Sequence, residues 1–60
     1  MKNMIMGFVN DGTKITIADA RTEITISKDN ILKVDADKIV IRNNNIISWV
    51  RWDDVKYFKF

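Results

Sequence analysis

The sequence predicts an all-β fold: a small antiparallel meander of about five to seven short strands that closes into a barrel or folds into a two-layer sandwich. Apolar β-branched residues alternate with polar ones over much of the chain, as in Lys14–Ile17 and Glu23–Ile26. This period-two pattern is typical of strands with one face in water. Polar turn segments separate the runs, which recur about every eight residues and so indicate a meander. We interpret residues 1–60 as one domain.

The first part of the chain predicts three strands, at about 4–9, 13–18 and 22–27. Asn10-Asp11-Gly12 separates the first two, and Asp-Gly is a favoured hairpin pair because it tolerates positive φ at both central positions. Asp19-Ala20-Arg21 separates the next two, where Asp can bond its own backbone. Helical spacing extends nowhere beyond about one turn, so no helix is expected.

Two further strands are predicted at about 31–35 and 38–42. The polar segments Lys28–Asn30 and Asp35–Asp37 precede them and supply turn residues. Asn43–Asn45 follows them, and Asn is the non-glycine residue most at ease in the left-handed region. These turns complete the alternation of short strands and short connections.

The last two predicted strands, at about 46–51 and 55–60, are apolar on both faces. Such strands have to be covered on both sides, and a chain of this length has little material for a second layer. Five of the six aromatic residues lie in the last twelve positions. They either fill a barrel core or lie at an interface, where Trp, Tyr and Arg dominate the energetics. The interface or ligand candidates are Trp49, Arg51, Trp52, Tyr57, Phe58 and Phe60.

The segment Trp52-Asp53-Asp54-Val55 places a Trp and two acids before the apolar residue that opens the last predicted strand. It resembles the closing element of several small bacterial β-domains, including SH3-like barrels and bacterial pleckstrin-like domains. The chain is also similar to an Sm-like ring protein in length and strand count. That family's Gly and Asn/Asp-rich RNA-binding signatures are absent from matching positions. The resemblance implies an SH3-like or Sm-like barrel and carries over no functional residues.

Several residue types that catalysis commonly uses are missing. The chain has no His and no Cys, which removes the usual general base, the thiol nucleophile, Cys/His zinc sites and disulfides. The acid pairs Asp35/Asp37 and Asp53/Asp54 lack the ligand number and spacing of known Ca²⁺ or Mg²⁺ loops. We interpret them as turn residues, and expect no enzyme activity, no catalytic residue, no metal site and no cofactor.

The net charge of +2 is unevenly distributed along the chain. Residues 1–37 carry five basic and six acidic side chains (−1), whereas residues 38–60 carry five basic and two acidic ones (+3). Basic residues interleaved with aromatics are typical of nucleic-acid-binding surfaces. In this interpretation Trp49, Trp52 or Tyr57 would stack on bases. The candidates for phosphate binding are Lys38, Arg42, Arg51, Lys56 and Lys59.

Three functions stay open from the sequence. The leading one is a non-enzymatic binding module that self-associates, because a domain this small lacks a disulfide or metal to stabilise it. The alternatives are a single-stranded nucleic-acid-binding β-barrel and a structural component of a phage particle or β-assembly. Abundant Ile, Lys and Asn indicate AT-rich coding DNA, so we expect an accessory protein of a phage, mobile element or low-GC bacterium. The expected partners are the protein itself, another protein or nucleic acid.

No run approaches the roughly 20 apolar residues of a membrane span, and the first residues lack the pattern of a signal peptide. We therefore expect a cytoplasmic protein that does not associate with membranes.

Overall fold

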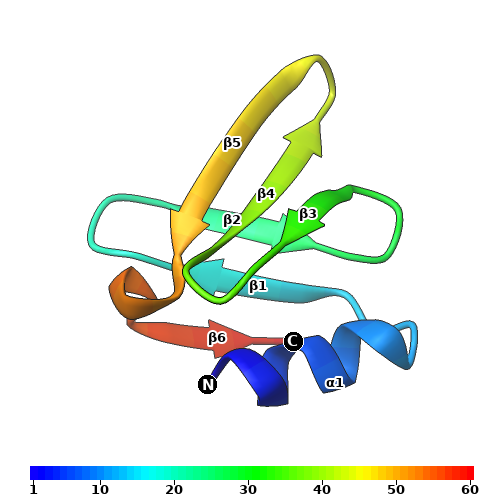
Figure 1. Cartoon of the computed structure of the whole chain (residues 1–60), viewed down its shortest axis with the longest axis vertical. Helices are drawn as coiled ribbons and strands as arrows, with labels where there is room; N and C mark the ends of the chain where they lie inside the picture. The colour runs from blue at the N-terminus through cyan, green and yellow to red at the C-terminus, as the bar shows by residue number, and fades with distance from the viewer.

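Six short strands form where the sequence alternates apolar and polar residues, and they assemble into two antiparallel sheets (Figure 1). The computed structural model describes residues 1–60. In chain order its elements are α1 (Lys2–Asn10), β1 (Ile15–Ala18), β2 (Glu23–Ile26), β3 (Ile31–Val34), β4 (Lys38–Asn43), β5 (Ile46–Arg51), a 3₁₀ turn (Trp52–Asp54) and β6 (Tyr57–Lys59). The expected mostly-β architecture is confirmed, and six predicted strands lie within a few residues of their expected positions.

The first sheet has the strand order β2-β1-β6, and the second has the order β3-β4-β5. Each sheet turns one row of alternate residues toward a shared core of ten buried residues. The first sheet contributes the paired Ile15 and Ile26, together with Ile17. The second contributes Ile39, paired with Val50, and other core-facing residues of β4. The two sheets form separate ladders, and their closure into a barrel remains a prediction.

The prediction of a strand at 4–9 is wrong, because residues Lys2–Asn10 form the helix α1. Ile5 and Val9 lie one helical turn apart and are both fully buried, with 0% and 1% of their surface exposed. Residues at i and i+4 lie on the same face of a helix, so this pair anchors α1 to the core. Phe8 packs partly buried against the same core. In Figure 1 the helix lies beside the end of β6.

The expected hairpin at Asp11-Gly12 is also wrong, because these residues terminate α1. The Gly12 N–H donates to the Val9 carbonyl at 3.0 Å, and the Thr13 N–H donates to the Phe8 carbonyl at 3.0 Å. These two bonds define a Schellman helix end, which needs a left-handed residue just after the helix. Gly12 supplies it with a φ of +92°.

Two tight turns of the same construction join β1 to β2 and β3 to β4. In the first, one carboxylate oxygen of Asp19 accepts the backbone N–H groups of Arg21 and Thr22 at 2.8 and 2.9 Å. In the second, one carboxylate oxygen of Asp35 accepts the N–H groups two and three residues later, both at 2.9 Å. The expectation that Asp bonds its own backbone in these turns is confirmed.

Candidate functional site

The pairing register of the second sheet places a single set of side chains on its outer surface. Val40 lies opposite Trp49 on β5 and opposite Lys33 on β3. Directly opposed residues share a sheet face, and so do alternate residues of one strand. Starting from Val40, these two rules determine which side chains of β3, β4 and β5 lie on the outer surface. We call it the cationic face, and it consists of Lys33, Lys38, Val40, Arg42, Ile47, Trp49 and Arg51.

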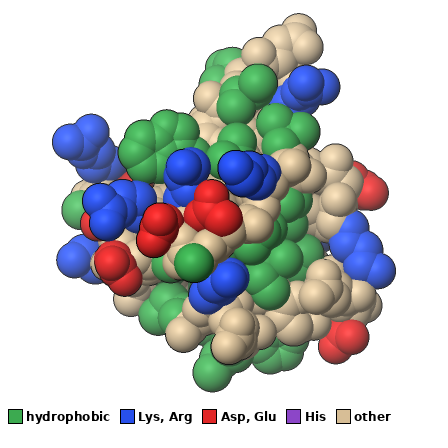
Figure 2. All heavy atoms as spheres, in the orientation of Figure 1, with side chains coloured by type: hydrophobic (Ala, Val, Ile, Leu, Met, Phe, Trp, Pro, Cys, Tyr) green, Lys and Arg blue, Asp and Glu red, His purple; other side chains and the backbone are tan.

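The cationic face exposes large apolar side chains beside its charges. Trp49 keeps 60% of its surface in contact with solvent, and Ile47 keeps 59%. Ile46, at the β4–β5 turn and on the opposite face of β5, keeps 67%. These three are all on β5, and none of them has a covering layer within the chain. Figure 2 shows basic and hydrophobic side chains side by side around β5, with acidic side chains next to them.

The cations of this face differ in their partners. The Lys33 and Lys38 ammonium groups each lie 4.0 Å from a carboxylate oxygen of Asp35, a long contact that is worth little at an exposed site. Neither Arg42 nor Arg51 has a carboxylate within ion-pair distance. Two guanidinium groups are therefore available to an external anion.

The pKa of Asp35 is held below its usual value, chiefly because its carboxylate accepts the backbone N–H groups of Lys38 and Asp37. The charges of Lys38 and Lys33 lower the pKa further, in smaller measure. One oxygen of Asp35 thus accepts the hydrogen bonds of its turn, while the other lies near the Lys33 and Lys38 ammonium groups and offsets part of their charge.

Strand β5 is an edge strand of its sheet, and its outward backbone groups are unpaired. The Trp52 N–H donates to the Asp37 carbonyl at 2.9 Å, and antiparallel ladders alternate bonded with non-bonded pairs. It follows that residues 46, 48 and 50 bond to β4, whereas Ile47, Trp49 and Arg51 direct their N–H and C=O groups away from the sheet. No hydrogen bond to another part of the chain engages those groups.

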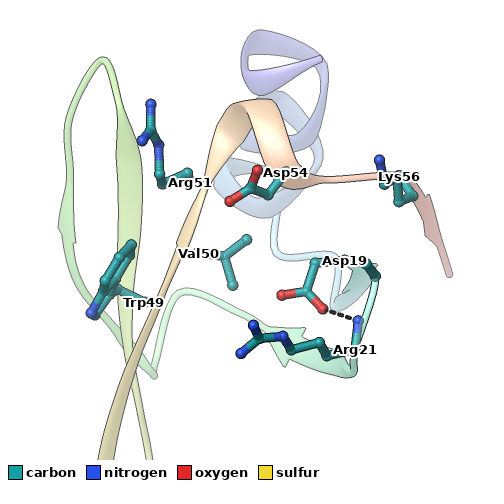
Figure 3. Close-up of a pocket in the computed structure, with 8 residues that line it drawn as sticks. Asp19, Arg21, Trp49, Val50, Arg51, Asp54 and Lys56 are labelled. Atoms are coloured by element: carbon teal, nitrogen blue, oxygen red, sulfur yellow. Dashed lines mark hydrogen bonds between the residues drawn. The ribbon is translucent and has the colours of Figure 1, made fainter.

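A cleft of about 460 Å³ borders β5 (Figure 3). One wall is formed by Trp49, Val50 and Arg51, and the opposite wall by the Asp19–Arg21 turn. Figure 3 shows the side chains of Asp19 and Arg21 extending from that turn toward β5. None of the lining residues comes from β4, so the cleft lies on the side of the free edge.

The remaining aromatic candidates lie elsewhere. Tyr57 projects from the outer face of the first sheet, where its hydroxyl donates to the Glu23 carboxylate at 2.8 Å. The Lys59 ammonium lies 3.1 Å from the same carboxylate oxygen. The Tyr57 bond is the main cause, and Lys59 the next, of a Glu23 pKa below its usual value. The same bond raises the pKa of Tyr57.

Phe58 and Phe60 form an aromatic cluster with Phe8 of α1. The ring centroids of Phe8 and Phe60 lie 4.9 Å apart in an edge-to-face arrangement, and those of Phe8 and Phe58 lie 6.4 Å apart. Phe58 is partly buried, whereas Phe60 exposes 74% of its surface. This cluster packs α1 against the end of β6.

Trp52 belongs to the core rather than to the surface. Only 9% of its surface is exposed, and its indole N–H donates to the Asp35 carbonyl at 3.0 Å. The 3₁₀ turn at Trp52–Asp54 interrupts the strand alternation after Arg51 and turns this side chain inward. Burial of Trp52 removes it from the accessible surface on which the interface and base-stacking predictions placed it.

The structure brings together only part of each predicted set. Of the six interface candidates, Trp49 and Arg51 share the cationic face. Of the five nucleic-acid candidates, Lys38, Arg42 and Arg51 share it, while Lys56 lines the cleft and Lys59 pairs with Glu23. Lys33 and Ile47 also belong to the cationic face. The sequence did not indicate them, because their positions depend on the strand register.

The acidic side chains do not gather into a group of three or more with metal-binding geometry. The structure also contains no helix with the length and hydrophobicity that crossing a membrane requires.

Comparison with known proteins gave no relative: no protein-family model, no curated protein and no solved structure matches the chain.

Proposed function

We propose that the protein is a non-catalytic binding module that self-associates through the free edge of β5. The observation that carries this proposal is the coincidence of unpaired backbone groups with exposed apolar side chains on one edge strand. Unprotected edges of this kind template pairing with another chain. Strand β5 is six residues long and has no proline or bulge to block such pairing.

The outward groups of β5 select one antiparallel register between two copies. Placing Trp49 opposite the Trp49 of a second copy pairs Ile47 with Arg51 on both sides of a two-fold axis. All three outward residues of each strand then form bonded pairs, which gives a continuous six-stranded sheet. A register centred on Arg51 would instead oppose two like charges, which is destabilising.

The cleft offers room for the incoming strand. In the Trp49-centred register, the Ile46–Ile47 end of one β5 lies beside Arg51 of the other copy. That is where the cleft between β5 and the Asp19–Arg21 turn opens. Two exposed isoleucines thereby leave water, which is favourable at about 25 cal/mol per Å² of apolar surface.

An SH3-like or Sm-like barrel, open beside β5, is the architecture we propose for the two sheets. The Arg42 N–H donates to the Asn30 carbonyl at 2.8 Å, which links the second sheet to the β2–β3 turn. The Lys56 N–H donates to the Ala18 carbonyl at 2.7 Å and brings the chain back to β1. The edge of β5 is unpaired and borders the cleft, so a second copy would add strands to the side of the barrel that is open there.

Solution mass tests the self-association directly. We expect light scattering coupled to size exclusion to give a dimer mass at micromolar concentration. Ile47→Pro should yield a monomer, because it removes an outward N–H and proline is tolerated where that group faces solvent. A wild-type monomer at all concentrations up to 100 μM, on the order of a weak specific affinity, would overturn the proposal.

Ile47→Thr is the matched control for the proline variant. Threonine keeps the β-branch and the backbone N–H, so the variant should stay dimeric with a larger dissociation constant. Circular dichroism of all three proteins should show the same strand content. A monomeric Ile47→Thr beside a dimeric Ile47→Pro would mean that side-chain contacts, and not edge pairing, hold the copies together.

A further inference from the structure

We propose that the cationic face binds single-stranded nucleic acid. This inference concerns the face of one protomer and does not depend on pairing at the β5 edge. The expected ligand is a polyanion with accessible bases, because the face combines positive charge with an exposed aromatic ring. The outer face of the first sheet also carries an exposed ring, Tyr57, but its Lys59 is paired with Glu23.

The charge of the face fits a phosphate backbone. It carries four cations, Lys33, Lys38, Arg42 and Arg51, on paired strands. Asp35 lies 4.0 Å from the two lysines, and Asp37 lines a hollow with Lys38, Trp49 and Arg51, so the two arginines carry the charge that is least offset. The two arginines have no intramolecular carboxylate partner, so their binding to phosphate breaks no ion pair. Guanidinium groups favour such contacts because their planar donors match phosphate oxygens.

The central aromatic side chain fits an unstacked base. Trp49 is flanked on its own strand by Ile47 and Arg51, and its ring is 60% exposed. Stacking of a base on such a ring is sequence-tolerant and contributes about 1–3 kcal/mol per base. A duplex keeps its bases stacked internally, so the ring would contribute nothing there. The face therefore discriminates single strands from duplexes.

The dimensions of the face suit a short segment of strand. β4 and β5 are six residues long, which corresponds to about 20 Å at the usual rise per residue. Lys38 and Arg51 lie at one end of the paired strands, and Arg42 and Ile47 at the other, with Trp49 between them. Phosphates on both sides of a stacked base can thus be contacted at once.

Fluorescence anisotropy of dye-labelled oligothymidylate and oligouridylate 20-mers is the direct test, because it measures affinity also for a variant without Trp49; tryptophan emission of the wild type gives a second readout. We expect quenching of the Trp49 emission and an affinity that falls with salt at a slope of about −3, from four phosphates at about −0.7 each. Trp49→Leu should weaken binding by at least about fivefold, since one base stack is lost. Absence of binding at 20 mM salt overturns the proposal, as does a duplex 20-mer that binds equally well.

Matched charge variants separate the cationic face from general attraction. Lys33→Gln with Arg42→Gln removes two charges from the face, and Lys2→Gln with Lys14→Gln removes two charges elsewhere. The first pair should reduce the salt slope by about 1.4, and the second should leave it nearly unchanged. Equal effects of the two pairs would overturn the proposal, as would stronger binding of polyglutamate than of either oligonucleotide.

The monomeric Ile47→Pro variant keeps all four cations and Trp49. Oligonucleotide binding by this variant would support the face as a site independent of dimerisation. Loss of binding despite an unchanged circular dichroism spectrum would overturn that independence.

Discussion

The two glycines of the protein lie five residues apart but have opposite conformational roles. Gly12 ends α1 with a φ of +92°, and Gly7 lies within the helix. A Cβ added at either position would meet no atom within 4 Å. The effect of substitution therefore depends on backbone conformation alone, without a steric contribution from neighbours.

Alanine substitutions at the two glycines should change stability in opposite directions. Gly12→Ala should lower the free energy of unfolding by about 1–2 kcal/mol, because an L-residue is strained in the left-handed region. Gly7→Ala should raise it by about 0.5–1 kcal/mol, because alanine loses less backbone entropy in a helix. Urea unfolding followed by circular dichroism measures both. Destabilisation of similar size at both sites would contradict a left-handed helix end at Gly12.

At this scale the sequence predicts some conformations and misreads others. Asn44 adopts a φ of 58°, as expected for the asparagine-rich turn between β4 and β5. Gly12 carries the same kind of signal, but left-handed residues end helices as readily as they close hairpins. A single residue type cannot distinguish the two, because the distinction depends on which carbonyls the following N–H groups reach.

The two Asp turns are the elements whose stability responds to acid. The pKa values of Asp19 and Asp35 both lie below their usual value, in each case mainly through hydrogen bonds from backbone N–H groups. A group whose pKa is depressed in the folded state stabilises that state above its unfolded pKa. The contribution is lost as the pH falls through the folded pKa, so both turns should weaken below about pH 4.

Replacement of both turn residues by asparagine tests this acid response. Asp19→Asn with Asp35→Asn keeps an oxygen that accepts the same N–H groups but cannot be protonated. This variant should lose less stability than the wild type between pH 5 and pH 3, measured by urea midpoints. Asp29→Asn with Asp53→Asn, whose carboxylates accept no hydrogen bond in the structure, should follow the wild type. Identical pH profiles for all three proteins would contradict the assignment.

The helix α1 shows why element type was predictable for the strands and not for the N-terminal segment. From Met4 to Val9 apolar residues occur at nearly every position, so the segment fits neither period well. Only Ile5 and Val9 become fully buried, a spacing that indicates a helix once burial is known. In β1 and β2 polar residues are regularly interleaved with isoleucines, and period two is then unambiguous.

At the scale of the whole molecule the sequence predicts the strands but not which of them share a face. Lys38, Arg42 and Arg51 lie on one surface because β4 and β5 pair in one register, while Lys59 is on another sheet. Register depends on turn geometry and on the burial of one face. Both emerge only when the chain folds around its common core, so a charge count along the sequence could indicate a basic surface without locating it.

The two sheets are coupled through the side chain of Asn30, which hydrogen-bonds to both of them. Its side-chain NH₂ donates to the Thr25 carbonyl of β2 at 2.8 Å and to the Asn43 side-chain oxygen of β4 at 2.9 Å. Its side-chain oxygen accepts the Ser27 N–H at 2.9 Å. One partly buried amide thus joins both ladders where the chain passes between them.

Asn30→Ala should therefore lower the free energy of unfolding by about 1–3 kcal/mol, from three lost bonds of about 0.5–1.5 kcal/mol each with partial replacement by water. Asn45→Ala, an exposed turn residue whose side chain makes no hydrogen bond, should stay within about 0.5 kcal/mol of the wild type. A double-mutant cycle of Asn30→Ala with Asn43→Ala isolates the inter-sheet bond and should give a coupling of about 0.5–1.5 kcal/mol. A coupling of zero would mean that the sheets are held together by their apolar core alone, and that the β2–β3 turn does not fix the angle at which the cationic face is presented.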